Sequence, residues 1–274
     1  MKSILVPTDF SKCASNAFKY ALEIAQATGA GITVLNVVFP NEGVDNNVYN
    51  AFWSDEYIAE RIKGLKDWVR RIVRKGQFQH VEVKTESTIG FPVTSICEVA
   101  DQMDADLIIM GTTGATGLRG VFLGSIAAGV LSKNSRPVLS VPIKAVQKKG
   151  TDTVFATDFR FKVDERSLAT LKEILALKKA KLRIIHIIDK VGEQVDKARE
   201  QTLSHKLDGI PHDFHYLHDR DVAQAVSNFV ESMDASALVA IAHEHSLLHR
   251  LFFDSITRRF AHRLHVPMLT LHDS

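Results

Sequence analysis

The 274-residue sequence has few cysteines, almost no net charge and no long apolar run. Its two cysteines, Cys13 and Cys97, are too few for a disulfide-stabilised fold, and we expect both to be reduced thiols that pack inside the protein. A net charge of +2 gives no reason to predict DNA or an anionic membrane as a partner. No segment approaches the ~18 apolar residues of a membrane span, and the N-terminus has no signal-peptide pattern. These absences predict a soluble, cytoplasmic protein.

The chain contains an internal repeat. An apolar run that ends in Thr8-Asp9-Phe10 returns in the second half as one that ends in Thr157-Asp158-Phe159. After each run, segments of helical apolar spacing alternate with short apolar segments up to a fifth strand. Because parallel strands need crossover helices, this order predicts an α/β fold of two doubly wound domains, each an open five-stranded parallel sheet with helices on both faces.

The expected boundaries follow from the same pattern. A short polar stretch, 146–151, separates a predicted domain at 1–145 from a second at 151–274. Later strands are expected at 32–38, 81–86, 105–110 and 136–141, and at 182–188, 214–217, 237–241 and 266–271. Helices are expected at 55–74 and 92–103, and at 193–207 and 222–233.

A glycine-rich segment follows the fourth predicted strand of the first half. Five of the 15 glycines fall within residues 111–125, and a helical pattern begins at Ile126. The amides of Gly124 and Ser125 are therefore expected at a helix N-terminus, which favours an anion such as phosphate. The hydroxyls of Thr112, Thr113 and Ser125 are candidate additional donors. A glycine-rich surface loop without any ligand is the alternative interpretation.

The predicted sheet places further polar and apolar residues near this segment. Ligands of open parallel sheets bind beyond the carboxyl ends of the strands. Asp9 ends the first predicted strand and Val37 ends the second, so one crevice would offer phosphate-binding amides, a carboxylate and an apolar wall. The sequence has no G-x-x-x-x-G-K-[ST] motif and no G-x-G-x-x-G after the first strand, which disfavours a P-loop NTPase and a dinucleotide cofactor.

With these motifs the chain resembles the universal stress protein family in its tandem two-domain form. The family's ATP-binding pattern, G-x2-G-x9-G-[ST], matches at Gly111, Gly114, Gly124 and Ser125. The opening Val-Pro-Thr-Asp-Phe-Ser and the turn at 90–92 also match. The resemblance implies an adenine nucleotide alpha hydrolase-like fold that binds ATP, with Mg²⁺ as a candidate companion ion.

The resemblance also assigns residues to parts of the nucleotide. Asp9 and Val37, with Pro7 and Thr8 beside them, would contact the adenosine. Met110 and Gly111 would lie near the ribose, and Gly114, Gly124, Ser125 and Ile126 would hold the phosphates. Arg119 either reaches a phosphate or is an exposed loop arginine.

The second half departs from this pattern. Ala242 stands in place of the first glycine and Asp254 in place of the last, in a segment one residue shorter. A carboxylate at the helix start would repel phosphate, so we expect ATP in the first domain only, although Asp158 and Ile187 keep the adenosine-side positions. Family members pair through their fifth strands, which implies pairing of 138–141 with 268–271 within one chain. A homodimer of whole chains stays open.

The sequence predicts binding and gives little support for catalysis. It has no paired carboxylates, nucleophile elbow or supported Ser-His-Asp order, so we assign no catalytic residue and expect at most weak ATP hydrolysis. Six of the 12 histidines lie at or after His243, but no H-E-x-x-H motif occurs, and we assign no metal site. The expected function is a nucleotide-dependent role in a stress response or regulation. The alternatives are a slow ATP hydrolase or nucleotidyl transferase, and a ligand-free interaction module.

Overall fold

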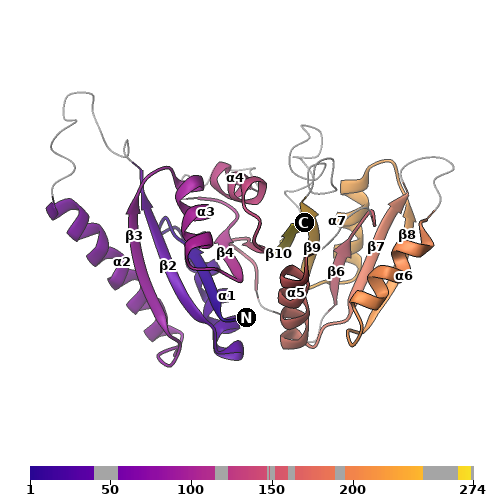
Figure 1. Ribbon diagram of the computed structural model, residues 1–274, viewed down its shortest axis with the longest axis horizontal. Helices are drawn as coiled ribbons and strands as arrows, with labels where there is room; N and C mark the ends of the chain where they lie inside the picture. Colours follow the sequence, from indigo (N-terminus) through magenta and orange to yellow (C-terminus); the bar gives the residue numbers. More distant parts are fainter. Residues whose placement is uncertain are drawn as a thin grey trace.

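A computed structural model describes residues 1–39, 55–114, 123–146, 148, 152–159, 164–188, 195–242 and 265–272. Its strands form one ten-stranded sheet with the order β3-β2-β1-β4-β5-β10-β9-β6-β7-β8. The first half of the chain supplies one side of this sheet and the second half supplies the other (Figure 1). The sequence repeat is therefore a repeat of strand order.

The elements of the first half follow the predicted order. They are β1 (Ser3–Pro7), α1 (Lys12–Thr28), β2 (Gly31–Val38), α2 (Asp55–Lys75), β3 (Val83–Ile89), α3 (Pro92–Gln102), β4 (Leu107–Gly111), α4 (Ser125–Lys133) and β5 (Val138–Val141). Those of the second half are β6 (Thr153–Ala156), α5 (Glu165–Lys178), β7 (Leu182–Ile188), α6 (Lys197–Lys206), β8 (His212–His218), α7 (Val222–Ser232), β9 (Ala237–Ala242) and β10 (Met268–His272). Residues 243–264, between β9 and β10, lie outside the described part of the chain.

Strand pairing is parallel within each half and antiparallel where the halves meet. In the first half β1 pairs with both β2 and β4, which makes the β1–β4 boundary the point where the strand order reverses. At the centre of the sheet β10 runs antiparallel to β5, with Met268 opposite Ser140 and Thr270 opposite Val138. The fold is thus the predicted α/β class with five parallel strands in each half.

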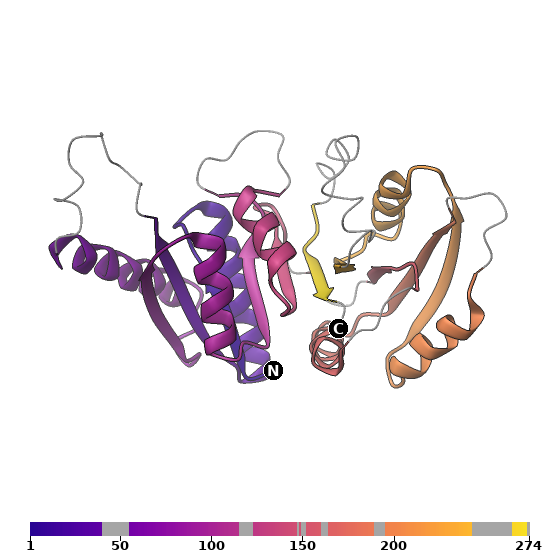
Figure 2. The same cartoon turned by 45° about the horizontal axis from the view of Figure 1, so that its top comes forward.

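Apolar residues on both faces of the strands explain why helices cover both sides of the sheet. Ile4 and Val6 pack with α1 and α2, whereas Leu5 between them packs with α3 and α4. In the second half α5 and α6 share the side of α1, and α7 shares the side of α3. Figure 2 shows α3 and α4 side by side over their face of the sheet. This alternation confirms the prediction of helices on both faces of the sheet.

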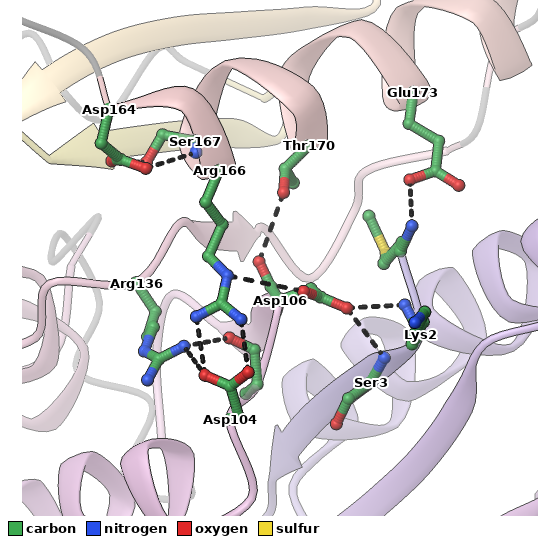
Figure 3. A network of polar contacts seen from close by, with 12 residues as sticks. Lys2, Ser3, Asp104, Asp106, Arg136, Asp164, Arg166, Ser167, Thr170 and Glu173 are labelled. Carbon is green, nitrogen blue, oxygen red and sulfur yellow. Dashed lines mark hydrogen bonds and ion pairs between the residues drawn. The ribbon is translucent and has the colours of Figure 1, made fainter.

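Contacts beyond the central strand pair also join the halves. At the amino ends of β1 and β4, Arg166 of α5 binds the Asp104 carboxylate with N–O distances of 2.5 and 2.8 Å (Figure 3). Arg136 donates to the same carboxylate over 2.7 Å. Elsewhere, His272 Nε2 at the end of β10 lies 2.9 Å from the carbonyl oxygen of Leu131 in α4. The second half therefore contacts the last turn of α4, the helix that begins at the candidate site.

The structure also describes the two cysteines and the lengths of the helices. Both cysteines are free thiols, with Cys13 buried and Cys97 partly buried. Among the helices that the structure describes, none combines the length and hydrophobicity needed to cross a membrane.

Candidate functional site

A cavity of about 550 Å³ lies at the carboxyl ends of β1, β2 and β4. Every residue that the sequence analysis assigned to nucleotide contact lines it: Pro7, Thr8, Asp9, Val37, Met110, Gly111, Gly114, Gly124, Ser125 and Ile126. The cavity therefore lies where the strand order reverses, the position at which open parallel sheets bind ligands. The contact of these residues with a nucleotide stays a prediction.

The turn after β1 holds Asp9 at the cavity. Phe10 has a left-handed backbone, with φ of 64°, and its N–H donates to Thr8 Oγ1 over 3.0 Å. The Asp9 carboxylate accepts from the Ser11 N–H over 3.0 Å. From β2, the Asn36 amide donates to the Thr8 carbonyl over 2.9 Å. Because both sides of the turn are hydrogen bonded, the Asp9 carboxylate has a fixed place at the strand end.

Two glycines of the motif lie where the chain packs closely. A Cβ at Gly111 would lie 2.9 Å from Cys13 Sγ, so only glycine lets the end of β4 approach the start of α1. A Cβ at Gly114 would lie 3.0 Å from Asp9 Oδ2 and would fill the space beside that carboxylate. The glycines thus join α1, the Asp9 turn and the segment after β4 into one wall of the cavity.

The start of α4 differs from the prediction in one respect. The Gly124 N–H donates to the Thr112 carbonyl over 2.6 Å, so this amide is already used and does not point to a ligand. Gly124 is the N-cap residue of α4 and supplies no side-chain cap. The next amides, those of Ser125, Ile126 and Ala127, have no partner within the helix because the first turn of any α-helix leaves its N–H groups unpaired. Such amides, together with the helix dipole, favour an anion at the start of a helix, so this end of the cavity suits one.

Sequence reasoning missed several lining residues. Arg61 of α2 lines the cavity, with its guanidinium carbon 5.7 Å from the centroid of the Phe10 ring. The remaining missed residues are Phe10, Ala14, Leu35, Asn36, Pro92, Ile96 and Ala127. One signal was available: Arg61 precedes Leu65 and Trp68 by four and seven residues, and both are buried on the inner side of α2. An arginine on that stripe faces inward.

The second half keeps the turn of the first half. Phe159 also has a left-handed backbone, with φ of 60°, and its N–H donates to Thr157 Oγ1 over 2.9 Å. His186 Nδ1 lies 2.9 Å from the Thr157 carbonyl, where the first half has Asn36. Among the described residues no cluster of three or more acidic, histidine or cysteine side chains has the arrangement of a metal site. Arg119, Asp254 and the segment around His243 lie outside the described residues.

Comparison with known proteins relates both the sequence and the fold to one family. The sequence model of the universal stress protein family matches residues 1–142. A universal stress protein of Methanocaldococcus jannaschii is 34% identical over 148 residues, which cover 51% of this chain and 81% of that protein. A second one from the same organism is 26% identical over 155 residues, 52% of this chain and 96% of the relative.

The fold likeness extends over the whole chain. The crystal structure of a universal stress protein from Archaeoglobus fulgidus has a TM-score of 0.71 and covers 99% of this chain, while 96% of that structure is matched. Its sequence identity of 20% makes this a likeness of fold alone. On the family match to the first half and the identity to its relatives, the chain belongs to the universal stress protein family.

Proposed function

We propose that the protein binds ATP in its first half and that nucleotide occupancy serves a stress-response or regulatory role. The observation that carries this proposal is the start of α4 at the cavity. Ser125, Ile126 and Ala127 line it, and Gly124 leaves the helix without a side-chain cap. A helix start that faces a cavity without its own capping group favours an external anion.

The rest of the cavity suits a nucleoside attached to that anion. Val37, Ile96 and Met110 provide apolar surface for a base. The Asp9 carboxylate, placed by its turn, can accept hydrogen bonds from sugar hydroxyls or a base amino group. If Mg²⁺ accompanies the nucleotide, phosphate oxygens and water would provide most of its ligands, because Asp9 is the one acidic side chain among the lining residues described here.

We infer a supporting role for the second half. The proposed domains are 1–145 and 151–274, and the antiparallel contact between β5 and β10 would hold them together as a pair within one chain. Asp254 at the position of Gly124 argues against a phosphate site in the second domain. We place the protein in the cytoplasm on its composition and family.

Isothermal titration calorimetry of the full chain with ATP, with and without Mg²⁺, tests this proposal. The expected result is saturable binding with one ATP per chain. Absence of binding would refute the nucleotide site, and two equivalent sites would refute the asymmetry between the halves. We would include cAMP in the titrations, since another universal stress protein has been solved as a complex with cAMP. Nucleotide turnover that disappears in Asp9→Asn would instead favour the slow hydrolase.

A further inference from the structure

A serine and a histidine meet where α6 leads into β8, the edge strand of the second half (Figure 1). Ser204 Oγ lies 2.9 Å from His212 Nε2, and His212 Nδ1 lies 2.7 Å from the carbonyl oxygen of Ile210. A tight turn, with Gly209 at a φ of 81°, brings the end of the helix back to the start of the strand. Both residues are partly buried, so a small molecule can reach them from solvent.

The two distances fix the direction of both hydrogen bonds. A carbonyl oxygen only accepts, so His212 Nδ1 carries the hydrogen that it donates to Ile210. In the neutral imidazole the other nitrogen is then an acceptor, and the Ser204 hydroxyl donates to it. The Phe214 ring packs edge-on against the imidazole, with centroids 5.6 Å apart. His212 is thus held in the tautomer that can take a proton from Ser204.

Other hydroxyls near helix ends of the second half have a different partner. Thr202, two residues before Ser204, donates to the Ala198 carbonyl over 2.9 Å, the common pattern for a hydroxyl within a helix. Ser232 at the end of α7 donates to the Phe229 carbonyl over 2.9 Å. Of these three hydroxyls, that of Ser204 is the one that contacts a base.

The first half shows what the fold itself needs at this place. Val83 is the first residue of β3, as His212 is the first residue of β8. Val83 lies opposite Ile32 and His212 lies opposite Leu182. In each half the N–H of that opposite residue donates over 2.9 Å to the carbonyl just before the edge strand, so the two places are equivalent. A valine suffices at the start of β3, and the fold therefore does not call for a histidine there.

We propose that Ser204 is a nucleophile activated by His212 and that it takes an acyl group from small activated esters, an activity separate from nucleotide binding. In this step Ser204 Oγ bonds to the acyl carbon, the ester C–O bond breaks, and the serine proton passes through His212 Nε2 to the leaving alcohol. Attack by water then releases the acid and restores the hydroxyl. The Ile210 carbonyl orients the imidazole, which is the part that a carboxylate plays in a Ser-His-Asp triad. Esters with a good leaving group, such as aryl esters, need the least further assistance and are the expected class.

An alkyl fluorophosphonate applied to the full chain tests the nucleophile. Ser204 Oγ would bond to phosphorus as fluoride leaves, and peptide mass spectrometry locates this permanent label. We expect Ser204 to be labelled about a hundredfold faster than Ser232, the lower end of what a general base contributes. His212→Val, which introduces the residue of the first half, should remove this advantage.

A second readout is the release of p-nitrophenol from p-nitrophenyl acetate. The part of this release that Ser204→Ala abolishes should also be absent in His212→Val. The control is His205→Gln, which removes an exposed histidine next to Ser204 and should keep the full rate. If His212→Val melts at a lower temperature than wild type, His212→Gln replaces it, since an amide stays polar and cannot take up the proton.

Several outcomes would overturn the inference. They are equal labelling of Ser204 and Ser232, labelling of Ser204 that persists in the folded His212 variants, and acetyl groups found on histidine rings but not on Ser204. None of these results depends on ATP. A chain that binds no nucleotide would refute the function proposed above and leave this test intact.

Discussion

Replacing Gly124 by aspartate should make the protein slightly more stable while removing ATP binding. Gly124 has a φ of −69° and a ψ of 160°, which any residue can adopt at a helix N-cap. The nearest atom to an added Cβ is the Thr112 carbonyl oxygen at 3.4 Å, an ordinary contact. Aspartate is among the best N-cap residues, and its charge is favourable at the helix start.

The substitution changes the stability of the fold and the affinity for ATP through different interactions. Relative to glycine, the aspartate cap and its charge should stabilise the fold by roughly 0.5–1 kcal/mol, which raises the melting temperature by about 1–3 °C. Its carboxylate would occupy the α4 amides and repel phosphate. Two unit charges 4 Å apart interact by about 4 kcal/mol at an effective dielectric constant of about 20. After allowance for screening by salt, ATP affinity should fall at least about a hundredfold.

Differential scanning fluorimetry and calorimetric titration measure these effects on the same preparation. The control is Gly64→Asp, which adds the same charge at an exposed position of α2 where a Cβ meets nothing within 4 Å. It should leave ATP affinity unchanged. A Gly124→Asp protein that binds ATP as tightly as wild type, or that loses more than about 1 kcal/mol of stability, would refute the assignment of the α4 start as an uncapped anion site.

Three further predictions concern groups outside the cavity. Burial lowers the pKa of His272 below 6.5, so its neutral form contributes stability that is present above pH 6.5 and is lost as the pH falls through the lowered pKa. Urea unfolding at pH 7.5 and 5.5 should therefore show a larger loss at low pH for wild type than for His272→Gln, and equal losses would contradict this. Burial raises the pKa of the Cys97 thiol, so at pH 8 a disulfide reagent should react more slowly with it than with a free cysteine peptide, with Cys97→Ser identifying the signal. Finally, a double-mutant cycle of Arg166→Met and Asp104→Asn should give a coupling of no more than about 1 kcal/mol, because the Asp104 side chain is 69% exposed; a coupling of several kcal/mol would show that this contact dominates the joint between the halves.

Much of the fold could be predicted because its strands are buried on both faces. An apolar run such as that of β4 is a strong local signal, and most elements of the first half recur among the described residues of the second. The signal weakens at the edge of the sheet. Strand β3 alternates half-buried and exposed residues, including Lys84 and Glu86, and its predicted range of 81–86 became Val83–Ile89. An edge strand pairs on one side only, so its sequence carries less of the apolar pattern.

The candidate site also has some features that the sequence predicts and others that it does not. The spacing of the glycine motif and the rule that ligands bind beyond the carboxyl ends of parallel strands predicted that Asp9, Val37 and the glycines lie together, and all of them line the cavity. These two signals depend only on the order of the elements along the chain. The use of the Gly124 amide by Thr112 could not be foreseen, since it depends on how the chain turns after β4. The Arg61 contact depends on the packing of α2 against the β1 turn. Such contacts are set by tertiary structure and leave only a weak trace in local sequence.

The turn after the first strand of each half has a consequence for how related chains are classified. Thr8 and Thr157 make the same hydrogen bond to the following phenylalanine, and a side chain from the neighbouring strand contacts each threonine carbonyl. The duplicate thus retains this geometry although its glycine motif is gone. In this chain the Thr-Asp-Phe sequence therefore accompanies the turn geometry, with or without the glycine motif. If the first half binds a nucleotide as proposed, the sequence difference to examine first in the second half is Asp254, which stands at the position of Gly124.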